Sequence, residues 1–194
     1  MTVSLNWQGP FGAECIPADP LIFERLCEPG VYLRIKRYKR DRIIAYVGQS
    51  VSLLPRFDQH LSAMLALASP LRDASGTLVF SGDAGARLRA FGNLDRFTAL
   101  AAEEVRRVSF FYALCNDYFH TEYLNLAEGL LQCRITQRTT DIENLVSAPR
   151  TMPEDVPDRW QNDFDALTAA GGQLLSNLLG TDPMTLESLA ENAA

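Results

Sequence analysis

The sequence predicts an α+β fold, in which a small three-stranded antiparallel sheet is flanked by helices. Two segments, 31–37 and 42–48, alternate apolar and polar residues on either side of a charged turn, a pattern typical of a β-hairpin. The apolar run 108–114 is rich in aromatic residues and predicts a third strand. Segments 53–68 and 120–138 repeat apolar residues at i, i+3 and i+4, which predicts two amphipathic helices.

The predicted hairpin has one apolar and one polar face. Val31, Leu33 and Ile35 point one way, and Tyr32, Arg34 and Lys36 point the other. On the second strand Tyr46 shares a face with Arg42 and Ile44. Tyrosines in such positions are commonly buried for structural reasons alone, so the pattern by itself does not assign them a chemical role.

Further helices are expected before the third strand and at the C-terminal end. The first covers 88–106; in it Leu88, Phe91 and Leu94 could pack as an added element, with Arg87, Arg89 and Arg96 exposed. A short strand is expected at 77–80, and a last helix covers 160–179, interrupted by two glycines. We therefore divide the chain into an N-terminal extension (1–28), a domain (29–148) with an insertion (69–107), and an acidic helical extension (149–194).

The composition is that of a globular protein with one core. The chain has 194 residues, of which 47% are hydrophobic, and its longest apolar stretch, 63–68, is far too short to span a bilayer. The first eight residues contain no basic residue and no apolar segment typical of a signal peptide. The cysteines are scattered without a C-x-x-C pair, which indicates free thiols and predicts a cytoplasmic protein: Cys15, Cys27, Cys115 and Cys133.

Charge is distributed unevenly along the chain. The net charge is −6, yet segment 30–60 holds seven basic and two acidic residues, whereas 151–194 holds one basic and eight acidic residues. Because local charge governs phosphate binding, we predict that the bases of the hairpin contact phosphates: Arg34, Lys36, Arg37, Lys39, Arg40 and Arg42. The alternative is an ordinary solvated face.

Several motifs resemble the GIY-YIG nuclease family. Gly30-Val31-Tyr32 is followed by Tyr46-Val47-Gly48-Gln49-Ser50, and then by Arg56 and His60, four residues apart. Further on come the expected third strand, Glu128 in a predicted helix, and Asn144. The resemblance covers roughly residues 29–146. Each short motif alone carries no information, but their combination in this order is specific.

The resemblance implies that the chain is a metal-dependent endonuclease, with DNA a more probable substrate than RNA. It implies catalytic roles for six residues: Tyr32, Tyr46, Arg56, His60, Glu128 and Asn144. Glu128 would hold one Mg²⁺ or Mn²⁺, Arg56 and Tyr46 would bind the scissile phosphate, and Tyr32 with His60 would deprotonate or orient the attacking water. Asn144 would organise the site, although its spacing is slightly longer than the family pattern.

The residue pattern supports part of this assignment independently. At about 100° per residue, Arg56 and His60 lie together on one flank of the apolar stripe of their helix. Glu128 lies at the edge of the apolar stripe of its helix, whereas Glu122 lies on the polar face. A carboxylate at a core edge can hold a hydrated divalent cation. Ordinary helix-edge roles for these side chains are the alternative.

Two other functions fit the same sequence. A nucleic-acid-binding module could retain the fold without catalysis, although all five motif side chains up to Glu128 are present. An unrelated α/β interaction protein could use the acidic tail to bind a partner. The sequence leaves the choice between monomer and homodimer open, and no membrane partner is expected.

Overall fold

The predicted hairpin and third strand form the antiparallel half of a larger sheet. The computed structural model describes residues 2–12, 20–139, 141–143 and 155–187. A six-stranded sheet has the order β3-β2-β6-β1-β7-β8. Its strands are β1 (Thr2–Gly12), β2 (Gly30–Arg37), β3 (Ile43–Ser50), β6 (Val108–Leu114), β7 (Arg159–Asp163) and β8 (Met184–Thr185). The prediction of a three-stranded sheet is therefore wrong, although the three expected strands are present and adjacent.

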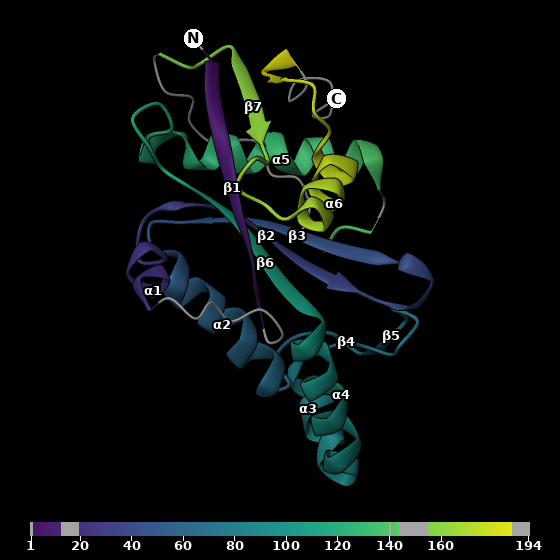
Figure 1. Ribbon diagram of the computed structural model, residues 1–194. Helices are drawn as coiled ribbons and strands as arrows, with labels where there is room; N and C mark the ends of the chain where they lie inside the picture. Colours follow the sequence, from purple (N-terminus) through teal and green to yellow (C-terminus); the bar gives the residue numbers. More distant parts are fainter. Residues whose placement is uncertain (1, 13–19, 140, 144–154, 188–194) are drawn as a thin grey trace.

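The N-terminal segment adds the fourth strand. Residues Val3, Leu5 and Trp7 are fully buried and alternate with polar residues, a period-two pattern that can be seen in the sequence. β1 pairs antiparallel with β6 and parallel with β7. It runs steeply across the direction of β2 and β3, so the sheet is strongly twisted (Figure 1). The segment is thus part of the sheet and not a separate extension.

The C-terminal part supplies the remaining strands. In place of the continuous helix expected over 160–179, the chain forms β7 and then α6 (Ala169–Leu179). Thr168 begins α6, and its hydroxyl accepts a hydrogen bond from the Gly171 amide. Trp7 Nε1 donates to Asn162 Oδ1 at 2.9 Å in a buried contact between β1 and β7. β7 carries polar residues at most positions, so its sequence gives little strand signal.

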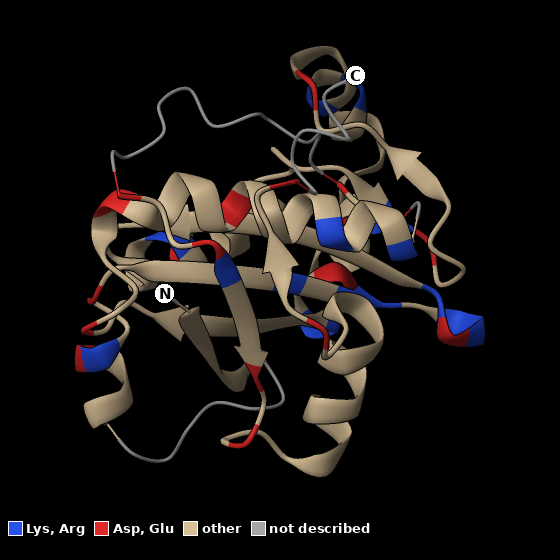
Figure 2. Cartoon of the chain, turned by 90° about the horizontal axis from the view of Figure 1, so that it is seen from above, with Lys and Arg blue, Asp and Glu red and all other residues tan. Residues whose placement is uncertain are grey.

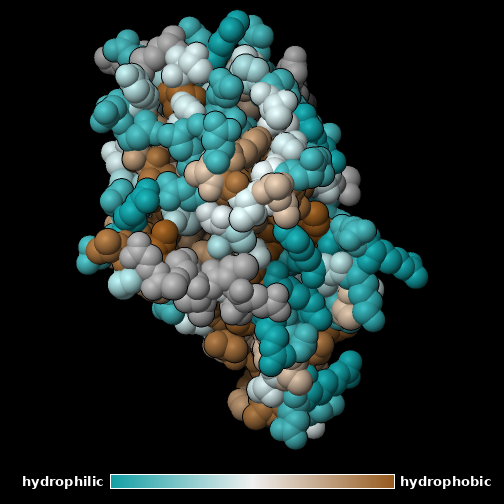
Figure 3. Space-filling model, in the orientation of Figure 1, coloured by the Kyte–Doolittle hydropathy of each residue, from teal (hydrophilic) through white to brown (hydrophobic). Residues whose placement is uncertain are grey.

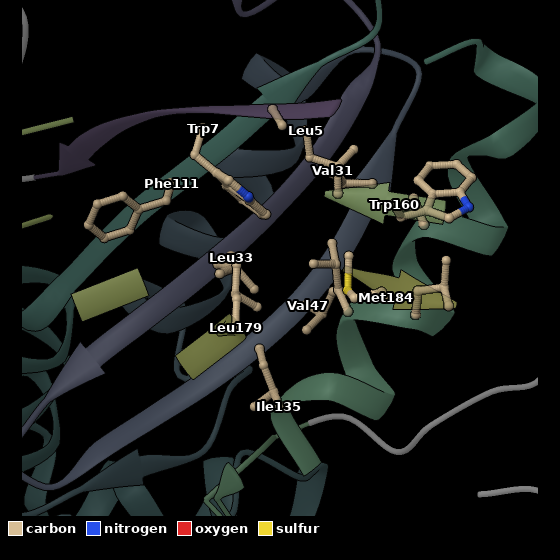
Figure 4. Close-up of a cluster of buried hydrophobic side chains, with 14 of the residues drawn as sticks. Leu5, Trp7, Val31, Leu33, Val47, Phe111, Ile135, Trp160, Leu179 and Met184 are labelled. Carbon is tan, nitrogen blue, oxygen red and sulfur yellow. The ribbon is translucent and has the colours of Figure 1, made fainter. Parts of the chain in front are cut away.

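Helices cover both faces of the sheet. α5 (Leu124–Arg138) and α6 pack on the face that carries Val31, Leu33 and Val47, where buried side chains from all six strands of this sheet meet (Figure 4). α2 (Leu53–Leu65) packs on the opposite face, beside the short α1 (Leu21–Arg25). Among the described residues, no helix is both long and apolar enough to cross a membrane.

The segment before the third strand forms a separate unit at one end of the molecule. It consists of β4 (Leu71–Arg72), β5 (Leu78–Phe80), α3 (Ala84–Ala90) and α4 (Leu94–Arg107). The one expected helix is therefore two, divided by the 3-10 turn η2 (Phe91–Asn93). Two further 3-10 turns are η1 (Lys39–Asp41) and η3 (Thr121–Tyr123). The α3–α4 pair projects away from the sheet (Figure 1).

Candidate active site

Four of the six predicted residues meet on the α2 face of the sheet. Antiparallel register places Tyr32 opposite Gly48 and Arg34 opposite Tyr46, so Tyr32, Arg34 and Tyr46 share that face. α2 is held over them by Phe57, whose ring stacks on that of Phe110 at 4.1 Å between centroids. This packing brings Arg56 and His60 onto the hairpin.

Tyr32 lies at the centre of the cluster. Its side chain is fully buried, and its hydroxyl lies 2.6 Å from His60 Nε2. Arg56 Nε donates to the same oxygen at 3.3 Å. A Cβ atom on Gly48 would lie 2.5 Å from Cζ and Oη of Tyr32, a separation too short for carbon atoms. Gly48 is therefore required on the neighbouring strand because the tyrosine ring occupies the space of a side chain.

The tautomer of His60 follows from its two partners. Arg34 Nη1 lies 2.8 Å from His60 Nδ1, and a guanidinium can only donate. Nδ1 of a neutral imidazole must therefore accept, which leaves the proton on Nε2. It follows that His60 donates to the Tyr32 hydroxyl oxygen.

Burial sets the protonation states of both groups. It lowers the pKa of His60 to about 3, with a further contribution from the neighbouring cations Arg34, Arg56 and Lys36. It raises the pKa of Tyr32 above its ordinary value; Tyr46 adds to this rise, and Arg56 opposes it. At neutral pH the free protein therefore contains a neutral imidazole and a protonated phenol.

Tyr46 and Arg56 form the outer side of the cluster. The Tyr46 ring lies 6.1 Å from that of Tyr32 and 5.0 Å from that of His60, measured between centroids. Arg56 Nη1 donates to Gln59 Oε1 at 2.8 Å. Arg56, Tyr46 and His60 are partly exposed, whereas Tyr32 is fully buried.

Glu128 lies on α5, which covers the opposite face of the sheet from α2, and its carboxyl group is near enough to Arg56 to be affected by its charge. It is half-buried, and burial raises the pKa of its carboxyl group, while the nearby Arg56 lowers it. Gln132 Nε2 lies 3.4 Å from its carboxylate. Glu122 is exposed, as its position on the polar face of the helix predicts. Asn144 lies outside the described residues.

The donor set suits only a cation that keeps most of its water. Within the described part of the chain, no three His, Cys, Asp or Glu side chains lie together as metal ligands. One half-buried carboxylate is compatible with Mg²⁺ or Mn²⁺, which take few protein ligands and complete their shell with water and other oxygen ligands. Glu128 therefore fits this type of ion and does not fit zinc.

Glu143 is a member of the cluster that the sequence did not indicate. Its carboxylate forms an ion pair with Arg34, and its backbone amide donates to the Ala45 carbonyl at 2.8 Å. The contact to Arg34 joins residues 109 positions apart, and no local pattern marks it. Glu143 thereby holds the guanidinium that sets the tautomer of His60.

Two of the six predicted phosphate-contacting bases do not lie at the surface. Arg34 and Lys36 are buried on the α2 face. Lys36 Nζ lies 2.9 Å from Glu104 and 3.4 Å from Glu143, because a buried ammonium needs a compensating carboxylate. The prediction that Arg34 and Lys36 contact phosphates at the surface is therefore corrected by their burial.

The other four bases lie at the end of the hairpin. Arg42 pairs with Asp141 through two hydrogen bonds of 2.8 and 3.0 Å. Arg37, Lys39 and Arg40 are exposed, and basic and acidic residues occur together in the η1 turn (Figure 2). The exposed positive surface of the hairpin is therefore smaller than its sequence suggests.

Comparison of the chain with protein-family models, with curated proteins and with solved structures finds no match.

Proposed function

We propose that the protein is a metal-dependent endonuclease of the GIY-YIG type that hydrolyses phosphodiester bonds, with DNA as the preferred substrate. The observation that carries this proposal is the meeting of Tyr32, Tyr46, Arg56 and His60, from three separate elements, on one face of the sheet. The antiparallel arrangement β3-β2-β6 around these residues supports it. In the described part of the chain, Cys27, Cys115 and Cys133 form no disulfide, which suits our prediction of a cytoplasmic location.

Arg56 and Tyr46 bind the scissile phosphate in this proposal. A guanidinium can hold two phosphate oxygens at once, and its positive charge stabilises the transition state more than the ground state, because negative charge develops during the attack. Glu128 holds the divalent cation. When bound, that cation supplies Lewis-acid stabilisation of the phosphate charge.

Tyr32 positions the attacking water. Hydrolysis forms a bond from the water oxygen to phosphorus and breaks the bond from phosphorus to the sugar oxygen, and the water loses a proton while the leaving oxygen gains one. The raised pKa of Tyr32 favours a hydrogen-bonding role over direct deprotonation in the free protein. His60 fixes the phenol through Nε2–H, and since its pKa is about 3, it is not a cationic acid at neutral pH.

Cleavage of supercoiled plasmid is the direct test. Wild-type protein with Mg²⁺ or Mn²⁺ should give nicked or linear DNA, and EDTA should abolish the reaction. Glu128→Ala should lower the rate at least about a hundredfold, whereas the matched variant Glu122→Ala should leave it nearly unchanged. Both variants should bind DNA.

Two results would contradict the proposal in different ways. Binding of DNA without cleavage, at any metal concentration, would identify a nucleic-acid-binding module that retains the fold. Folded protein that neither binds nor cleaves duplex, branched or single-stranded DNA, or RNA, would exclude both functions.

A further inference from the structure

The end of the α3–α4 pair exposes apolar side chains that the fold does not use. Leu88, Phe91 and Leu94 are 70%, 72% and 44% exposed, in contrast to the packing expected for them from the sequence. The core of this unit is built from other residues: Leu67, Leu71, Phe80, Ala86, Ala90 and Ala101. Side chains of this size exposed together commonly mark an interaction surface, here at the far end of the projecting helices (Figure 3).

Arginines surround these apolar side chains. Arg87, Arg89 and Arg96 are exposed, and none of them forms an ion pair with an acid in the described part of the chain. Segment 83–96 contains two acidic residues, Asp83 and Asp95, against three arginines, and Arg89 is near enough to Asp83 to help lower the pKa of its carboxyl group. Although the whole chain is acidic, this end of it is positively charged and apolar at once.

The projecting unit lies on the same side of the sheet as the candidate active site. α4 packs against α2, which carries Arg56 and His60, and both lie on the opposite side of the sheet from α5 and α6 (Figure 1). With 14 residues, α4 is about 21 Å long. A polymer bound across Arg56 and Tyr46 can therefore extend to the far end of the α3–α4 pair.

We propose that the apolar tip (Leu88, Phe91 and Leu94, with Arg87, Arg89 and Arg96) is a DNA-contacting wedge. The arginines bind phosphates of the duplex, and Phe91 with Leu88 enters a groove and partly unstacks a base step, a use of apolar side chains known for proteins that deform DNA. This inference rests on the proposed nuclease function and adds to it the element that recognises the duplex.

A second copy of the chain fits this surface less well. In a twofold contact the same patch meets itself, which would place the three arginines of one tip against the three of its partner, with two aspartates, Asp83 and Asp95, on each side. Like charges brought together in this way oppose association. A DNA backbone offers the complementary charge instead.

Binding of a fluorescein-labelled duplex, measured by anisotropy in EDTA over a range of salt concentrations, tests the arginines. Arg87→Gln/Arg89→Gln should lower the slope of log affinity against log salt by about two units, since each phosphate contact contributes about 0.9. The control Arg25→Gln/Arg159→Gln removes the same charge from exposed positions elsewhere and should leave the slope unchanged.

The apolar side chains are tested with the same duplex carrying 2-aminopurine, whose fluorescence rises when it is unstacked. Leu88→Ser/Phe91→Ser should weaken binding about tenfold and abolish the fluorescence rise. The control Leu21→Ser/Tyr118→Ser changes side chains that are 58% and 61% exposed and should do neither. Because all four side chains are exposed, unfolding temperatures should stay close to that of the wild type.

The possible failures can be told apart. If the wild type cleaves DNA but the tip variants bind and cleave equally well, the wedge is wrong and the nuclease function stands. If the wild type sediments as a dimer that Leu88→Ser/Phe91→Ser dissociates with unchanged DNA affinity, the tip binds a second copy and the wedge is also wrong. If the wild type binds no DNA, both proposals fall.

Discussion

At the scale of single residues, His60 has both ring nitrogens occupied by groups from β2. Arg34 donates to Nδ1 at 2.8 Å and the Tyr32 hydroxyl lies 2.6 Å from Nε2. Because one partner can only donate, the direction of the second hydrogen bond is decided by the first. The residue that controls the orientation of the tyrosine hydroxyl is therefore Arg34, supported by Glu143.

We expect His60 to be a neutral imidazole protonated on Nε2. Protein labelled with ¹⁵N in its histidine rings should show an unprotonated Nδ1 for this residue at neutral pH. The chain has two histidines, so a His120→Gln sample assigns the signals. Protonation of His60 on Nδ1 would contradict the arrangement around Arg34.

Buried His60 should also make folding sensitive to acid. Its pKa falls from 6.5 in the unfolded chain to about 3 in the folded protein, so the unfolded state binds a proton over a pH range in which the folded state does not. Stability should therefore fall as the pH drops from 6.5 towards 3, by about 2–4 kcal/mol from this residue alone. The glutamine of His60→Gln has an amide that can accept from Arg34 and donate to Tyr32 but does not titrate. Urea unfolding of this variant at several pH values should therefore lack the loss of stability that His60 causes. Equal pH dependence of stability in both proteins would refute this role of His60.

The acid limit of catalysis should reflect Glu128. Its carboxylate must be ionised to hold a cation, and burial raises its pKa while Arg56 lowers it. Metal-dependent cleavage should therefore fall off at a higher pH than the ordinary pKa of a glutamate would give. In Arg56→Gln the residual activity should fall off at a still higher pH, because the opposing charge is gone; a shift to lower pH would show that Arg56 does not act on this carboxylate.

At the scale of elements, the site forms because β2 and β3 of the hairpin lie close together and α2 packs closely on them. Gly48 on β3 leaves room for the Tyr32 ring on β2, and Phe57 on α2 stacks on Phe110 of β6. Gly48 of the second motif is thus required for a steric reason, because the ring of Tyr32 from the first motif fills the space that a side chain would need. The two motifs are coupled through one contact.

Replacing Gly48 should damage the site more than the fold. Gly48→Ala would place a methyl group 2.5 Å from the Tyr32 hydroxyl, so the buried ring must move away from His60 and Arg56. We expect at least a tenfold loss of cleavage rate, equivalent to about 1.4 kcal/mol in the barrier, with the fold retained by circular dichroism. Gly172→Ala adds the same methyl group at a position where the nearest atom, Cβ of Phe164, is 3.8 Å away, and should be silent; equal losses in both variants would contradict the steric explanation.

At the scale of the whole molecule, the two ends of the chain complete the sheet. β1 lies between β6 and β7, and Trp160 of β7 is fully buried beside the rings of Phe119 and Tyr123, each about 6 Å away between centroids. The described residues 155–187 of the acidic C-terminal part are thus integrated into the sheet and its core. Their strands and α6 close the core under the site.

Removal of this part should therefore destroy the fold. Deletion of the chain after Pro153 should give protein without a cooperative thermal transition, because β7, β8 and α6 all bury core side chains. Trp160→Ala is the milder variant and should cost about 3–5 kcal/mol of unfolding free energy, measured by urea denaturation. The exposed neighbour Gln161 provides the control, since Gln161→Ala should change stability by less than about 0.5 kcal/mol. A folded truncated protein would show that the sheet is stable without its last two strands.

The sequence by itself determined five of the elements, β2, β3, β6, α2 and α5, and identified most of the residues of the candidate site. Alternation with period two marks β2 and β3, the apolar run marks β6, and helical spacing marks α2 and α5, because these patterns depend only on which side chains face a core. The placement of Arg56 and His60 on the flank of α2 follows from the same periodicity.

Only the tertiary structure decided which elements lie beside one another. The ion pair of Arg34 with Glu143 spans 109 positions and the bond of Trp7 to Asn162 spans 155, and nothing in either segment marks its partner. Burial of Arg34 and Lys36 depends on carboxylates brought from α4 and from the chain after α5. From the sequence alone a charged residue is expected to be exposed, because burying an unpaired charge is costly. The carboxylates that compensate this cost become neighbours of Arg34 and Lys36 only when the chain folds.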